Sequence, residues 1–227
     1  MSVRLASGIT GQSFYVVTKR FLCNRDPGSK AFHHQHARVG VQESSPQNNF
    51  RRIIATFIPA GEFCNHTVNY CPAHRSQIDL RLLLCLLNSK LAEWYFRLGS
   101  TNAHVSHYQL ANLPMPKFAD GIPSNARQRD AVLRKLSAGQ VDAAFELLHP
   151  LLADAPFDPL LRDALIAAVD RITDLEQRRG EISRTARSAL APTAQPFQDF
   201  IDRILFQMAG LTADEITGLE QRLAKML

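Results

Sequence analysis

Residues 76–117 (SQIDLRLLLCLLNSKLAEWYFRLGSTNAHVSHYQLANLPMPK) constrain the fold more than any other stretch. Large apolar side chains recur there at alternating spacings of four and three residues, namely Leu80, Leu84, Leu87, Leu91, Trp94 and Leu98. This spacing predicts the buried stripe of one amphipathic helix, with Ser76 as N-cap and Gly99 as C-terminal stop. Residues 100–107 are polar, and the two prolines of residues 113–116 (LPMP) cannot continue a helix. We therefore expect a buried helix, a polar loop and a stiff, extended exit.

The chain before this stretch has the composition of strands. Segments rich in β-branched and aromatic residues, each bounded by turn formers, predict strands at residues 13–18, 37–41 and 51–58, with a short fourth at 63–71.

The chain after residue 120 is helix-forming. The expected helices span residues 126–137, 141–149, 159–179, 196–209 and 213–226. Gly210 suits a left-handed C-cap, and Thr212 to Glu215 read as a capping box. The fold class is therefore α+β, with a β-containing domain (residues 1–118) that holds the central helix and an all-helical domain (residues 119–227).

Composition places the chain among ordinary water-soluble proteins. Of its 227 residues, 45% are hydrophobic and 21% are charged, and no apolar run is long enough to cross a membrane. The N-terminus lacks the apolar core of a signal peptide, and four cysteines are too few to suggest a disulfide framework. We expect a cytoplasmic protein.

Charge is divided unevenly along the chain. Residues 1–120 hold 13 Lys or Arg against six Asp or Glu, whereas residues 121–227 hold 13 against 15. This asymmetry favours a first half that faces a polyanion. Basic surfaces are also common on proteins that bind no polyanion, so charge alone puts the hypothesis of nucleic-acid binding at even odds.

Motifs for catalysis and metal binding are missing. Cys64, His66, Cys71 and His74 are close together, but their spacing is not that of a zinc site, and a buried cysteine is more often a small apolar side chain. The chain has no nucleophile elbow, no HExxH, no P-loop and no dinucleotide fingerprint. We predict no metal, no cofactor and no catalytic residue in this chain.

Candidate DNA-binding residues are more plentiful. Arg38, Arg51 and Arg52 offer guanidinium groups suited to phosphate oxygens. Asn102, His104 and Ser106 lie in the polar loop, where amide, imidazole and hydroxyl groups can approach base edges. For any single residue, a merely polar loop is the favoured explanation. Taken together, with a second polar loop at residues 42–49, they predict a surface that reads bases.

Several ordered motifs carry a family resemblance. Asn88-Ser89, the aromatic residues 94–96 (WYF) and the LPMP of residues 113–116 follow one another within residues 83–118, and Asn69-Tyr70 follows the Arg-rich segment at residue 51. In this order and spacing, residues 35–118 resemble the C-terminal target-recognition (specificity) domain of Taq-type adenine-N6 DNA methyltransferases and the related fused restriction–modification enzymes.

The resemblance implies recognition without catalysis. In that family this domain binds duplex DNA and reads the target sequence, while a separate domain binds S-adenosylmethionine and methylates a flipped adenine. The present chain lacks the [NDS]-P-P-[YFW] tetrapeptide and the glycine-rich cofactor loop that such chemistry needs. The expected function is thus sequence-specific duplex DNA recognition within a restriction–modification system. Enzymatic activity is expected only as part of a site-specific adenine-N6 DNA methyltransferase or type II restriction enzyme.

Partners and alternatives follow from this reading. The expected partners are duplex DNA and a separate methyltransferase or restriction subunit, with no membrane. Because Met1 lies close to where the recognition region begins, the chain is expected to be a detached specificity subunit, a split gene product or a truncated remnant. The alternative is a protein-interaction or remnant domain that binds no DNA and docks a partner through its helical half. The apolar stripe that begins at Leu160 and Leu161 would serve that docking, although the core of a helical bundle explains it as well.

Overall fold

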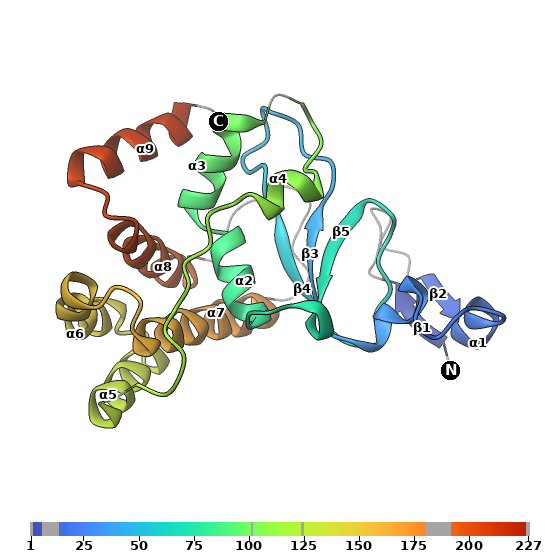
Figure 1. The fold of residues 1–227 in the computed structure, drawn as a ribbon, viewed down its shortest axis with the longest axis horizontal. Coiled ribbons are helices and arrows are strands. Elements are labelled where there is room, and N and C mark those ends of the chain that lie inside the picture. Colours follow the sequence, from blue (N-terminus) through green and yellow to red (C-terminus); the bar gives the residue numbers. More distant parts are fainter. Residues whose placement is uncertain (1, 6–13, 101, 124, 180–191, 226–227) are drawn as a thin grey trace.

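A small antiparallel sheet lies at the centre of the first half (Figure 1). The structure, a computed structural model, describes residues 2–5, 14–100, 102–123, 125–179 and 192–225. Within these residues β3 (Arg38–Gln42) is the middle strand, and β4 (Ala55–Ile58) and β5 (Val68–Pro72) pair with it antiparallel on either side. A separate ribbon of β1 (Ser2–Leu5) and β2 (Phe14–Val17) leads into α1 (Thr18–Leu22) and the 3₁₀ helix η1 (Lys30–Gln35).

The strand predictions are confirmed for β2 and β3, with Ser13 outside the described residues. The fourth strand, predicted over residues 63–71, begins only at Val68, as β5. The strand predicted from residue 51 begins only at Ala55. Its first part was wrong because the backbone N–H groups of Arg52 and Ile53 donate to the carboxylate of Glu93 instead of to a neighbouring strand.

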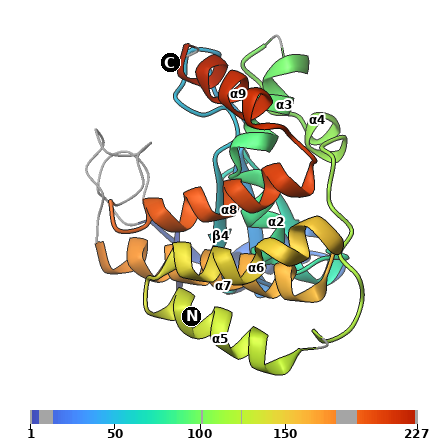
Figure 2. The ribbon, with the colours of Figure 1, turned by 90° about the vertical axis from the view of Figure 1, so that its left-hand side faces the viewer.

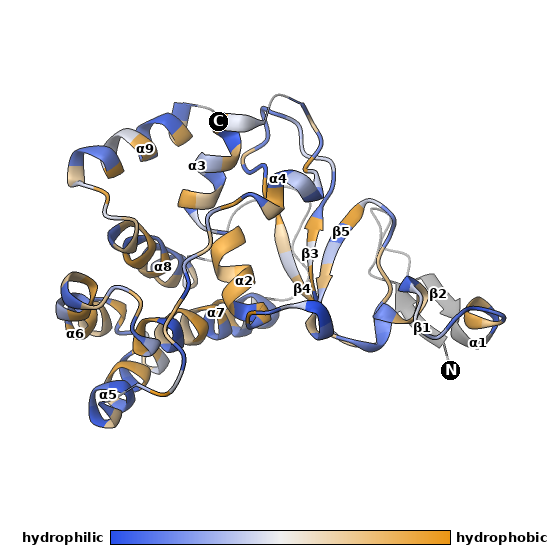
Figure 3. Cartoon of the chain, viewed as in Figure 1, coloured by the Kyte–Doolittle hydropathy of each residue, from blue (hydrophilic) through white to orange (hydrophobic). Residues whose placement is uncertain are grey.

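The prediction of a single central helix was also wrong, because the chain forms two helices there. α2 (Leu80–Leu87) is capped by Asp79 rather than Ser76, and α3 (Lys90–Gly99) begins anew at Ser89, whose side chain accepts a hydrogen bond from Ala92 N. Six of the eight residues of α2 are buried, and the helix is hydrophobic along almost its whole length (Figure 3). The expected stripe does not continue into α3, where Leu98 is 59% exposed.

The helical half follows the predicted order. Its elements are α5 (Ala126–Ser137), α6 (Val141–Asp154), α7 (Pro159–Arg179), α8 (Gln195–Met208) and α9 (Ala213–Lys225), with the predicted end at residue 226 outside the described residues. Gly210 has a positive φ of 68°, and the reciprocal bonds between Thr212 and Glu215 complete the predicted capping box. The prediction that α6 stops at His149 was wrong, because Pro150 is accommodated inside the helix.

The two halves share one hydrophobic core. α7 packs against α2, α5 and α8, and Figure 2 shows α8 above α7 and α5 below it. The boundary predicted between residues 118 and 119 falls in the irregular segment that links α4 (His107–Ala111) to α5. The division into two domains stays a prediction, whereas the core runs across the boundary. Within the described residues, no helix is both long enough and apolar enough to span a bilayer.

Candidate nucleic-acid interface

Two polar loops meet at the upper end of the sheet in Figure 1. Ser45 N donates to Ala103 O at 2.8 Å, and Val105 N donates to Glu43 O at 2.7 Å, so that Ser44 and His104 face each other as an isolated β-bridge. We call residues 43–50 together with 102–107 the loop pair. The structure thus brings together the two polar loops that the sequence predicted only separately.

A buried serine fixes the first loop from inside. Ser45 is fully buried, and its hydroxyl donates to Arg51 O at 2.8 Å while accepting from Asn49 Nδ2 at 3.2 Å. These bonds cross-link the two ends of the loop and restrict its backbone. Phe50, at the end of the same loop, is 47% exposed.

A buried carboxylate braces the loop pair from the α3 side. Glu93 is 4% exposed; its Oε1 accepts from Arg52 N at 2.8 Å and from Arg97 Nε at 2.6 Å, and its Oε2 accepts from Ile53 N at 3.0 Å. Arg97 in turn donates to Asn49 O at 2.8 Å. One carboxylate therefore holds the backbone after the first loop and, through Arg97, the loop itself.

Arg52 connects the same region to the second loop. Its side chain is 1% exposed, and its guanidinium donates to Ser100 Oγ at 3.1 Å and to Asn102 O at 2.5 Å. The guanidinium also lies 5.4 Å from the centre of the Phe96 ring, in cation–π geometry. Arg52 and Glu93 together form a buried brace beneath both loops.

The other two predicted arginines are likewise directed at main-chain oxygens. Arg38, 2% exposed, donates to Glu62 O, and Arg51 donates to Asn88 O at 2.6 Å. A phosphate contact by Arg38, Arg51 or Arg52 would require its guanidinium to leave these acceptors, and the predicted contact stays a prediction. The sequence showed three basic residues but not the buried carbonyl groups that surround them.

The predicted base-reading residues lie on the surface of the second loop. Asn102 and His104 are exposed, and Asn102 Oδ1 accepts from His104 N at 3.0 Å, which orients the amide. Ser106 is half-buried and caps α4 in a capping box with Gln109. Tyr108, absent from the sequence prediction, is 79% exposed beside this loop, where its ring is free to stack.

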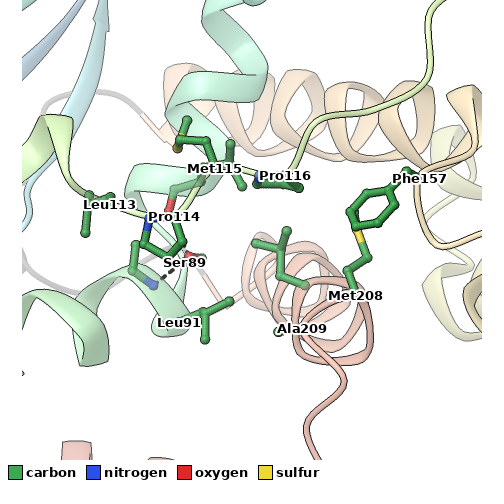
Figure 4. Close-up of a pocket in the computed structure, with 12 residues that line it drawn as sticks. Ser89, Leu91, Leu113, Pro114, Met115, Pro116, Phe157, Met208 and Ala209 are labelled. Atoms are coloured by element: carbon green, nitrogen blue, oxygen red, sulfur yellow. Dashed lines mark hydrogen bonds between the residues drawn. The ribbon is translucent and has the colours of Figure 1, made fainter.

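An apolar groove lies away from the loop pair (Figure 4). It has a volume of about 280 Å³ and lies between α3, the LPMP segment and α8. Leu91, Met115, Pro116, Phe157 and Met208 line it, and Figure 4 shows Phe157 and Met208 side by side at one end. No group of three or more His, Cys, Asp or Glu suited to a metal ion was found among the described residues.

Comparison with known proteins yields a structural relative. No family model and no curated protein matches the chain. The fold is similar to that of the Type IIL restriction–modification enzyme MmeI, solved in complex with DNA, with a TM-score of 0.52 and 13% sequence identity. The alignment covers 99% of this chain and 31% of the enzyme chain, so this chain spans about a third of that enzyme's length. At this identity the similarity shows a shared fold, one that occurs within a restriction–modification enzyme.

Proposed function

We propose that the chain is a sequence-specific duplex DNA recognition module of a restriction–modification system of the adenine-N6 methyltransferase kind. The observation that carries this proposal is the loop pair, in which exposed amide and imidazole groups stand on a backbone braced by the buried Glu93 and Arg52. A rigid loop loses little conformational entropy on binding, which favours readout of particular bases. The fold shared with an enzyme solved in complex with DNA supports the same function.

The loop residues divide by role in this proposal. Asn102 and His104, exposed at the surface, contact base edges, and Ser106 positions them by ending the loop in a helix cap. Arg52 holds the loop, because its guanidinium binds Asn102 O. Methylation and cleavage belong to another polypeptide or to further domains, which accords with the missing cofactor motifs.

The test is selection of binding sites from a random duplex pool at two salt concentrations. We expect binding at low salt that weakens steeply as salt rises, together with enrichment of one short sequence. Asn102→Ala should relax preference at one position of that sequence, with discrimination there falling by about 1–3 kcal/mol. Gln221→Ala, which removes an exposed amide on α9, is the matched control and should change nothing. Absence of binding at low salt would refute the proposal.

The second candidate is a docking module that binds no DNA, and the apolar groove beside α8 is the observation that favours it. Its occupant would be a separately encoded methyltransferase or restriction subunit. Size-exclusion chromatography of the two proteins distinguishes the functions. Co-elution that Met208→Glu abolishes, with no DNA binding by the isolated chain, would favour docking over recognition.

A further inference from the structure

A second cleft lies next to the loop pair, between η1, β5 and residues 63–66. Its volume is about 760 Å³. His107, the first residue of α4, lines the cleft, and so does Asn69, whose amide donates to Val105 O at 2.8 Å. The cleft is therefore continuous with the second loop through one hydrogen bond and one shared side chain.

The lining of this cleft has one sign of charge. Among the described residues that line it there is no Asp or Glu, whereas Arg25, Lys30, Arg38 and Arg75 contribute cations. Four histidines, His107 among them, also line the cleft and become cationic when protonated. A concave surface lined by one sign of charge concentrates the electric field and attracts counter-charged ligands.

Buried polar groups beneath the cleft have unused hydrogen-bonding capacity. His33, 5% exposed, has Nδ1 at 3.2 Å from Tyr70 Oη, while its Nε2 has no partner in the described part of the chain. Arg38 Nε is also unpartnered among the described residues, and its guanidinium lies 5.5 Å from the Tyr70 ring centre. Unpaired buried polar groups are costly, which marks them as candidates for a ligand contact.

The environment of His33 disfavours its protonated form. Burial lowers the pKa of His33, and the positive charges of Arg75, His74 and His36 lower it further. The coulombic part of this shift reflects the surplus of positive charge around His33, which would favour a bound anion.

We infer that this cleft binds a backbone phosphate of the same duplex that the loop pair reads, on the flank of the recognised sequence. The inference rests on the proposed function. Because a cation on a phosphate carries no sequence information, the cleft contributes affinity and register while the loop pair contributes specificity. Arg75 and Lys30, both exposed at the cleft, make the contact.

The experiment measures the salt dependence of affinity for three duplexes of different sequence. Arg75→Ala and Lys30→Ala should each weaken all three alike, by roughly tenfold at low salt, and reduce the slope of log K against log salt by about 1. Arg134→Ala removes an exposed cation from α5 and should change neither quantity. Unaltered affinity and slope in both cleft variants, with wild-type binding intact, would overturn the inference and leave the proposed function standing.

A separate arm distinguishes a DNA phosphate from a free anion. The melting temperature is measured with inorganic phosphate and with chloride at equal ionic strength, for the wild type and for Arg75→Ala. Stabilisation by phosphate that Arg75→Ala abolishes, together with unchanged DNA affinity in that variant, would identify a free-anion site and overturn the inference. If the wild type binds no duplex at all, the proposed function fails first, and this inference fails with it.

Discussion

Replacing Glu93 by alanine should destabilise the protein strongly. The carboxylate accepts from Arg52 N, Ile53 N and Arg97 Nε, and the side chains of Glu93 and Arg97 are 5% and 7% exposed. Removing one partner of such a buried pair costs about 3–5 kcal/mol, since the remaining donors stay desolvated without an acceptor. For a chain of this size that corresponds to a fall in melting temperature of roughly 10 °C.

Urea unfolding followed by far-ultraviolet circular dichroism at pH 7 measures this loss. Glu220→Ala is the matched control, because Glu220 pairs with Lys90 at 2.6 Å with both side chains more than a third exposed, a type of pair that contributes about 0–1 kcal/mol. Glu93→Gln should fall between the two, since it keeps one acceptor oxygen but turns an amide N–H toward a backbone N–H. A Glu93→Ala variant that loses no more stability than Glu220→Ala would refute the role assigned to the buried brace.

Three further outcomes are expected. The pKa of Asp202 is raised to about 6 by burial, so this carboxyl binds its proton more tightly in the folded state. The free energy of unfolding should therefore fall by about 2 kcal/mol from pH 4 to pH 7, and urea unfolding of Asp202→Asn should lack this contribution. Gly40→Ala should lower the free energy of unfolding by about 1–3 kcal/mol, because the added Cβ would lie 2.5 Å from a side-chain atom of β4. In the same assay Gly99→Ala should be neutral or stabilising, because a Cβ at residue 99 meets nothing within 4 Å. In a thiol titration of the native protein, the exposed Cys23 should react readily and Cys85, whose thiol pKa is raised by complete burial, should react only after unfolding.

Local signals predicted the elements whose ends are marked in the sequence. α5 and α7 match their predicted ranges, and the Thr212 cap forms as expected, because capping and apolar spacing act within a few residues. The break at Ser89 was missed because a serine inside an apolar run reads as a tolerated interruption. The hydrogen bond that Ser89 Oγ accepts from Ala92 N is visible only in the three-dimensional structure.

The candidate site was predictable in part. The polarity of Asn102 and His104 marked the second loop correctly as surface. The pairing of Ala103 and His104 with Ser45 and Ser44 could not be predicted, because it depends on contacts between segments far apart in the sequence. The same limitation hid the surroundings of Arg52: a guanidinium in a polar stretch looks accessible until Glu93 and Ser100 are placed beside it.

The interruption between α2 and α3 also affects whether strands of other chains can pair with the sheet. β4 is an edge strand, and an exposed edge is a template for pairing with a foreign strand. The side chain of Asn88 occupies that template: its Oδ1 accepts from Ala55 N at 3.3 Å and its Nδ2 donates to Ala55 O at 3.1 Å, as a peptide group of an added strand would. The residue that ends α2 therefore protects the sheet against edge-to-edge aggregation at the first residue of β4.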